Sequence, residues 1–179
     1  RLENKSDAGP IDFNVDKVEE LYKAMNQTPS DRFRQLADFI TAYNKKAKAV
    51  ADALKQAEDL RTSVENLNTW PSNTYFSGVQ EKLSRIAFGL PKPGMLGHGK
   101  YANYRCVTLL NQSIQSARNR IEGLRRDYRQ ADAVVPEINR YLNQKNYPEA
   151  IRVVKSNSDL GFLKKIYANL DKMSLDAQK

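Results

Sequence analysis

Apolar residues recur at alternating steps of three and four through much of the second half of the chain. They are Val107, Leu110, Ile114, Ala117, Ile121, Leu124, Tyr128, Ala131 and Val135. This is the heptad spacing of a helix that buries one stripe against a neighbouring helix. It is the strongest structural signal in the sequence, and it predicts one long helix from about Tyr101 to Val135.

A second stripe of the same kind precedes it. Its members are Phe33, Leu36, Ile40, Tyr43, Ala47, Val50, Leu54 and Ala57. The stripe then shifts by one residue and continues through Leu60, Val64 and Leu67, which predicts a local change of winding. We expect a helix from about Pro29 to Asn68, with Thr28 as its N-cap and Pro29 in its first turn.

Two helices of this length favour an all-α fold, namely an elongated helical bundle built on two long antiparallel coiled-coil-like helices. A shorter helix at about residues 75–88 and the Gly/Pro-rich loop 89–100 would fold back at one end. The alternative is a parallel homodimeric coiled coil. The mixture of Ala, Ile, Leu and Tyr along the seam favours an irregular bundle within one chain.

Two domains are expected. Residues 1–135 form the long-helix bundle with a flexible N-terminal lead-in, and a first helix begins near Asn14 with an apolar face at Val15, Val18, Leu21, Tyr22 and Met25. Pro136 opens a series of shorter helices. Residues 136–179 are therefore expected to form a small C-terminal helical subdomain, packed on the bundle or following it.

Charge is distributed unevenly along the chain. Residues 1–70 contain 11 Lys+Arg and 12 Asp+Glu, whereas residues 71–179 contain 18 and 9, so the whole positive excess lies in the second part. Such asymmetry is typical of a surface that faces an anionic partner. The simpler interpretation is a well-solvated, self-repelling surface.

Arginines concentrate in the second long helix. At 100° per residue, Arg118, Arg125 and Arg129 share one face, while Arg126 points elsewhere. Guanidinium groups suit phosphates and carboxylates because they donate two parallel hydrogen bonds. These four residues and Lys100 are our candidate anion- or partner-binding residues. Glu122 lies at intrahelical pairing distance, so a salt-bridged solvent face is the alternative.

Lys100 closes a run, Gly94 to Lys100, that matches part of a nucleotide-binding P-loop. The run lacks the Ser or Thr that would hold magnesium, because Tyr101 follows, and no strand precedes it. We therefore expect a flexible interhelical loop with an exposed His98. Its backbone N–H groups, together with Lys100, could still hold an anion.

The usual elements of catalysis are missing from the sequence. Cys106 and His98 are the only residues of their types, so one chain cannot build a Cys/His zinc site. Cys106 lies beside the apolar stripe and is expected to be a small core residue. We expect no enzyme activity, no catalytic residues, no metal and no cofactor.

These observations favour a non-enzymatic helical protein–protein interaction or scaffolding module with a basic C-terminal surface and an acidic protein partner. The alternative is a binder of nucleic acid or anionic membrane through the Arg-rich second long helix.

We expect no transmembrane segment and a soluble chain. The sequence begins at Arg1, so the N-terminus is missing or processed, and cytoplasmic and exported locations both remain open. Homo-oligomer formation is also left open.

Overall fold

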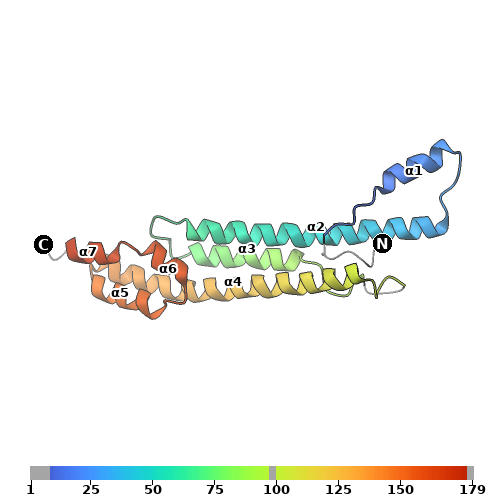
Figure 1. The fold of residues 1–179 in the computed structure, drawn as a ribbon. Coiled ribbons are helices and arrows are strands. Elements are labelled where there is room, and N and C mark those ends of the chain that lie inside the picture. The colour runs from blue at the N-terminus through green and yellow to red at the C-terminus, as the bar shows by residue number, and fades with distance from the viewer. Residues whose placement is uncertain (1–8, 97–99, 177–179) are drawn as a thin grey trace. The chain divides into compact units, whose positions relative to one another are not determined.

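The computed structural model describes residues 9–96 and 100–176, and within those ranges it contains helices and no strand (Figure 1). This confirms the all-α bundle. The helices are α1 (Val15–Ala24), α2 (Asp31–Glu65), α3 (Tyr75–Gly89), α4 (Arg105–Asn143), α5 (Tyr147–Ser156), α6 (Gly161–Ile166) and α7 (Leu170–Asp176). None of these described helices is long and apolar enough to cross a membrane.

The chain divides into two compact units. Unit 1 is Arg1–Ala53 with Gly89–Arg118, and unit 2 is Leu54–Phe88 with Asn119–Lys179. Each unit therefore contains a segment of α2 and a segment of α4. The boundary predicted after Val135 concerns a different division and stays a prediction.

The core of unit 1 lies between α2 and α4. Its buried side chains include Ile40, Tyr43, Ala47, Val50, Val107, Leu110 and Ile114 from the two predicted stripes, together with the neighbouring Cys106. Phe39 stacks on Tyr101 with ring centroids 4.4 Å apart. The Tyr43 hydroxyl donates to the carbonyl oxygen of Cys106 at 3.4 Å. Cys106 is fully buried, as expected.

Helix α1 begins where the sequence predicts. The Asn14 side chain caps it by accepting a hydrogen bond from the Lys17 N–H at 2.9 Å. The expected apolar face, however, is not buried, since no residue of α1 is buried and Leu21 is 55% exposed. Just before α1, the buried Ile11 exchanges two backbone hydrogen bonds with the Asn44 carboxamide, at 2.6 and 3.0 Å. Residues 1–8 of the predicted lead-in lie outside the described residues.

The N-cap of α2 differs from the prediction. Ser30, rather than Thr28, accepts a hydrogen bond from the Phe33 N–H, at 3.3 Å. The reason is that α2 begins at Asp31, which puts Ser30 at the N-cap position and leaves Pro29 outside the helix.

The direction of the two long helices is the main correction. In unit 1, Lys100 just before α4 binds Gln35 of α2, and Cys106 of α4 accepts from Tyr43 of α2. In unit 2, Arg120 of α4 pairs with Glu58 of α2, and Tyr128 of α4 shares a groove with Glu65 of α2, whose charge raises the pKa of Tyr128. Residue numbers therefore rise together in each unit, so the α2 and α4 segments run parallel and the expected antiparallel pair is wrong.

Helix α3 explains this direction. In unit 2, Asn73 just before α3 forms a hydrogen bond with Asn139 of α4, and Ser77 of α3 forms one with Asp132 of α4. Residue numbers therefore fall along α4 as they rise along α3. Helix α3 thus runs antiparallel to α4 (Figure 1). Because α3 reverses the chain direction after α2 and α4 reverses it again, α2 and α4 run parallel. The prediction treated α3 as a fold-back at one end and missed this full return.

Helix α4 continues through Pro136 to Asn143 instead of ending at Val135. A proline inside a helix removes one backbone hydrogen bond. Burial of Ile138 (0% exposed) and the bonds made by Asn139 hold the following turns in place. The short helices α5 to α7 then contribute buried apolar residues to unit 2, among them Ala150, Val153, Val154, Leu163 and Leu170.

We predict that Ile138→Ala lowers the free energy of unfolding by about 2–5 kcal/mol, because it empties a fully buried site. Urea denaturation followed by circular dichroism measures the change. Gln130→Ala, on the exposed side of α4, is the matched control and should shift stability by less than about 0.5 kcal/mol. Equal effects of the two substitutions would contradict a buried α4 beyond Pro136.

Candidate partner-binding groove

Arg118 holds a loop in unit 1. Its Nη2 donates to the carbonyl oxygens of Leu90 at 2.8 Å and of Pro91 at 3.1 Å. Its Nε is buried and has no hydrogen-bond partner among the described residues. The guanidinium group therefore holds residues 90–91, which follow the end of α3, and is not free to bind a ligand.

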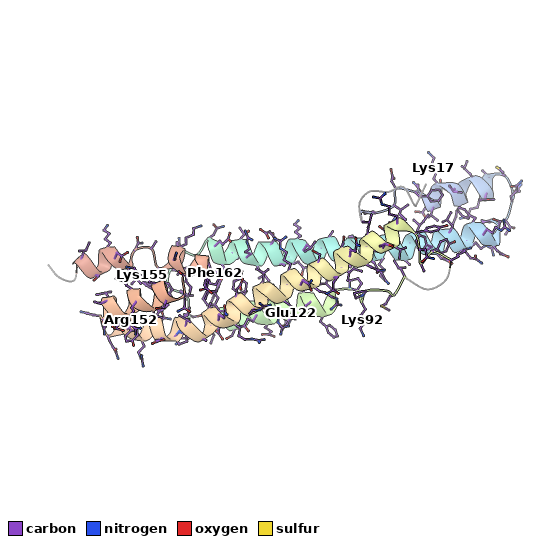
Figure 2. The ribbon with its side chains drawn as sticks, turned by 60° about the horizontal axis from the view of Figure 1, so that its bottom comes forward. Lys17, Lys92, Glu122, Arg152, Lys155 and Phe162 are labelled. Carbon is purple, nitrogen blue, oxygen red and sulfur yellow. The ribbon has the colours of Figure 1, made fainter. Side chains whose placement is uncertain are left out.

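The other three arginines of the candidate set lie in unit 2. Arg125 Nη1 donates to Glu122 at 2.6 Å, and the Arg125 side chain is only 28% exposed (Figure 2 labels Glu122). Arg126 and Arg129 are exposed, and their side chains make no ion pair or hydrogen bond with the described residues. The structure thus splits the set into engaged and free cations, and it brings no two of them onto a common ligand.

Lys100 is engaged as well. Its ammonium group donates to Gln35 Oε1 at 2.8 Å and lies 5.0 Å from the centre of the Tyr101 ring. In the same loop, Gly94 has a φ of +81° and its N–H donates to Asn111 Oδ1 at 3.0 Å. That N–H is therefore occupied, which weakens the expected anion site. His98 falls outside the described residues.

Elements far apart in sequence form an open groove in unit 2, which we call the Trp70 groove. It is lined by residues from the segment 70–73, between α2 and α3, and from the segment 136–147, which spans the end of α4 and the start of α5. Its volume is about 660 Å³. Asn139 Nδ2 joins the two sides, donating to the Pro71 carbonyl oxygen at 3.3 Å and to Asn73 Oδ1 at 2.8 Å.

Aromatic rings shape the Trp70 groove. Trp70 is the only tryptophan of the chain and is 37% exposed. Its ring packs on Tyr167 at a centroid distance of 4.2 Å. Tyr167 is buried, which raises the pKa of its hydroxyl, and that hydroxyl has no hydrogen-bond partner among the described residues. The buried Tyr167 ring therefore packs against one side of the Trp70 indole, and another part of the indole is exposed to solvent.

Polar groups in the Trp70 groove remain available. Asn143, Gln144 and Tyr147 line it, and their side chains make no hydrogen bond to any described residue. Arg140 lies over the Tyr141 ring at 4.8 Å, is 59% exposed and reaches Glu137 only at 3.9 Å. The lining contains this one cation and no carboxylate. Such a surface can bind another chain by hydrogen bonds and an ion pair.

A second, smaller groove of unit 2 lies where Arg61 and Glu65 of α2 face Asp127, Tyr128 and Lys165. Phe162 packs on Tyr128 there at 5.4 Å (Figure 2 labels Phe162). Burial, followed by the charge of Glu65, raises the pKa of Tyr128 to about 12. The phenol thus stays protonated near neutral pH. Its charged neighbours carry both signs and favour no ligand class.

Other reactive groups do not assemble into a centre in the part of the chain that the structure describes. No three His, Cys, Asp or Glu side chains there come close enough to hold a metal ion. The thiol of Cys106 is buried in unit 1.

Sequence reasoning missed the Trp70 groove. The segments that form it are residues 70–73 and 136–147. Their signal was a tryptophan with several Asn and Gln residues in two helix-ending segments. Antiparallel long helices would place these segments at opposite ends, and only the parallel arrangement within unit 2 joins them.

Comparisons with known proteins give no match: no family model, no curated protein and no solved structure is similar to this chain.

We predict that Arg118→Ala lowers the free energy of unfolding by about 1–3 kcal/mol, because two carbonyl groups lose their charged donor. Arg126→Ala removes an exposed arginine of the same helix and should change it by less than about 0.5 kcal/mol. Guanidinium denaturation compares the two variants. If both lose the same small amount, Arg118 has no structural role.

Tyr128 makes stability depend on pH in the alkaline range. Its folded pKa of about 12 exceeds the unfolded value of 10, so above pH 10 the unfolded chain loses this proton first. The stabilisation is complete below pH 10 and is lost as pH rises towards 12. We predict that, between pH 9 and 11.5, the free energy of unfolding falls by about 2 kcal/mol more with Tyr128 than in Tyr128→Phe. The test is urea denaturation of both proteins from pH 9 to 11.5, and parallel curves would refute it.

Proposed function

We propose that this chain is a non-enzymatic protein-binding module whose partner docks in the Trp70 groove of unit 2. The observation that carries the proposal is the combination of a part-exposed Trp70, an accessible Arg140 and unpartnered carboxamides in one open groove. Tryptophan, tyrosine and arginine are the residues that most often dominate binding energy at protein interfaces.

The support of Trp70 by Tyr167 favours this function. A ring that is already fixed loses little conformational entropy when a partner covers it. Its 37% exposure leaves apolar surface that gains from burial. Because it sits beside hydrogen-bonding groups, the groove resembles a preformed recognition surface more than a gap in the packing.

The charge of unit 2 favours an acidic partner. Its two segments, residues 54–88 and 119–179, together contain 16 Lys+Arg and 12 Asp+Glu. Within the groove itself, Arg140 has no competing carboxylate among the lining residues. An acidic segment would gain an ion pair with Arg140, whereas a basic one would meet repulsion.

Binding of nucleic acid or anionic membrane through α4 has less support. Arg118 is committed to two carbonyl groups and Arg125 to Glu122. Tyr101, whose ring precedes α4, has Phe39 stacked against it and the Lys100 ammonium nearby. These groups would have to leave their present partners before they could bind phosphate or a base.

The proposal is tested by photo-cross-linking. A benzophenone amino acid at Asn143, in the groove, should cross-link a defined partner protein in an extract of the source cells. The same amino acid at Gln130, exposed on α4 outside the groove, is the control. We expect Trp70→Ala to lower the yield from position 143 several-fold, with an unchanged helical spectrum. Equal cross-linking from positions 143 and 130 would refute the proposal.

A further inference from the structure

We infer that the occupant of the Trp70 groove is an extended peptide segment that carries a carboxylate. This inference rests on the proposed function and specifies which feature of the partner protein the groove reads.

The carboxamides of the groove offer a matched donor and acceptor. Asn139 uses its Nδ2 for Pro71 and Asn73, while its Oδ1 accepts from no described residue. Asn73 uses its Oδ1 for Asn139, while its Nδ2 donates to no described residue. The bond between them thus leaves an acceptor on Asn139 and a donor on Asn73 unused. A peptide unit presents the complementary pair, an N–H and a C=O.

Further side chains that can donate or accept hydrogen bonds line the groove at Asn143, Gln144 and Tyr147. A helical partner satisfies its backbone N–H and C=O groups internally and has little use for such groups. An extended segment has every backbone group free and needs partners for them once water is displaced. The excess of carboxamides therefore favours an extended segment over a docking helix.

Arg140 supplies the preference for a carboxylate. It is the one charged side chain of the lining, it is 59% exposed, and the nearest carboxylate, of Glu137, lies at the edge of ion-pair distance at 3.9 Å. The Tyr141 ring beneath it at 4.8 Å limits where the guanidinium can go. A guanidinium group held in this way can donate two parallel hydrogen bonds to one carboxylate.

Apolar contact and size complete the match. Trp70 and Leu142 line the same groove and can cover an apolar side chain that neighbours the carboxylate. The volume of about 660 Å³ lies within the ~300–1,000 Å³ typical of ligand sites. We expect the groove to accommodate a short stretch of peptide with an apolar residue and an acidic residue close together.

The test begins with random octapeptides displayed on phage and selected on the intact chain. We expect the selected peptides to be enriched in Asp or Glu next to apolar residues. A synthetic selected peptide should then shift the fluorescence of Trp70, which is the only tryptophan. Arg140→Gln should weaken its binding at least about tenfold, as expected for a lost charge-assisted bond. Arg85→Gln, which changes an exposed arginine of α3 outside the groove, should leave binding unchanged.

Peptide variants identify the source of the carboxylate. One variant keeps its acidic side chains and carries a C-terminal amide, and a second has amidated side chains and a free C-terminus. Binding of either, with loss in Arg140→Gln, supports the inference and names the source. Absence of enriched peptides, or undiminished binding of a fully amidated peptide, overturns it. Position 143 would still cross-link a folded partner in that case, so the two proposals fail separately.

Discussion

Burial of the heptad stripe on α4 is the constraint on which the rest of the structure depends. From Val107 to Ile138 its apolar side chains are almost all removed from water, and the same helix supplies core residues to both units. Each deeply buried Ile or Val contributes roughly 1.5–3 kcal/mol relative to exposure. That repeated gain outweighs the cost of Pro136 and carries α4 onward to Asn143, where it forms one side of the Trp70 groove.

Helix direction then decides which segments can meet. Because α3 returns along α4 in unit 2, the chain leaving α2 at Glu65 reaches the end of α4, not its beginning. Trp70 and Asn73 thereby come beside Asn139 and Arg140. The proposed binding function is thus a consequence of topology, since the same residues on antiparallel long helices would share no surface.

The sequence predicted well what periodicity governs. It located both long helices, the burial of Ile121 and Tyr128, and the Asn14 cap, because apolar spacing and capping are local properties. It failed where tertiary contacts decide. Arg118 donates to the carbonyl oxygens of Leu90 and Pro91, and Asn139 donates to Asn73. Each of these bonds joins residues that are far apart in the sequence. The exposed face of α1 was likewise missed, since an amphipathic pattern does not reveal whether a partner covers it.

The most direct test of this account is proximity between the two sides of the Trp70 groove. In a Cys106→Ala background, Asn73→Cys with Asn139→Cys should be joined by a short bifunctional thiol reagent in dilute monomer, because these two side chains are in contact. Asn73→Cys with Gln130→Cys is the control, nine residues away or roughly 13 Å along α4. Efficient cross-linking of the first pair alone is the predicted result. Equal or absent cross-linking of both pairs would contradict the parallel arrangement and remove the groove with it.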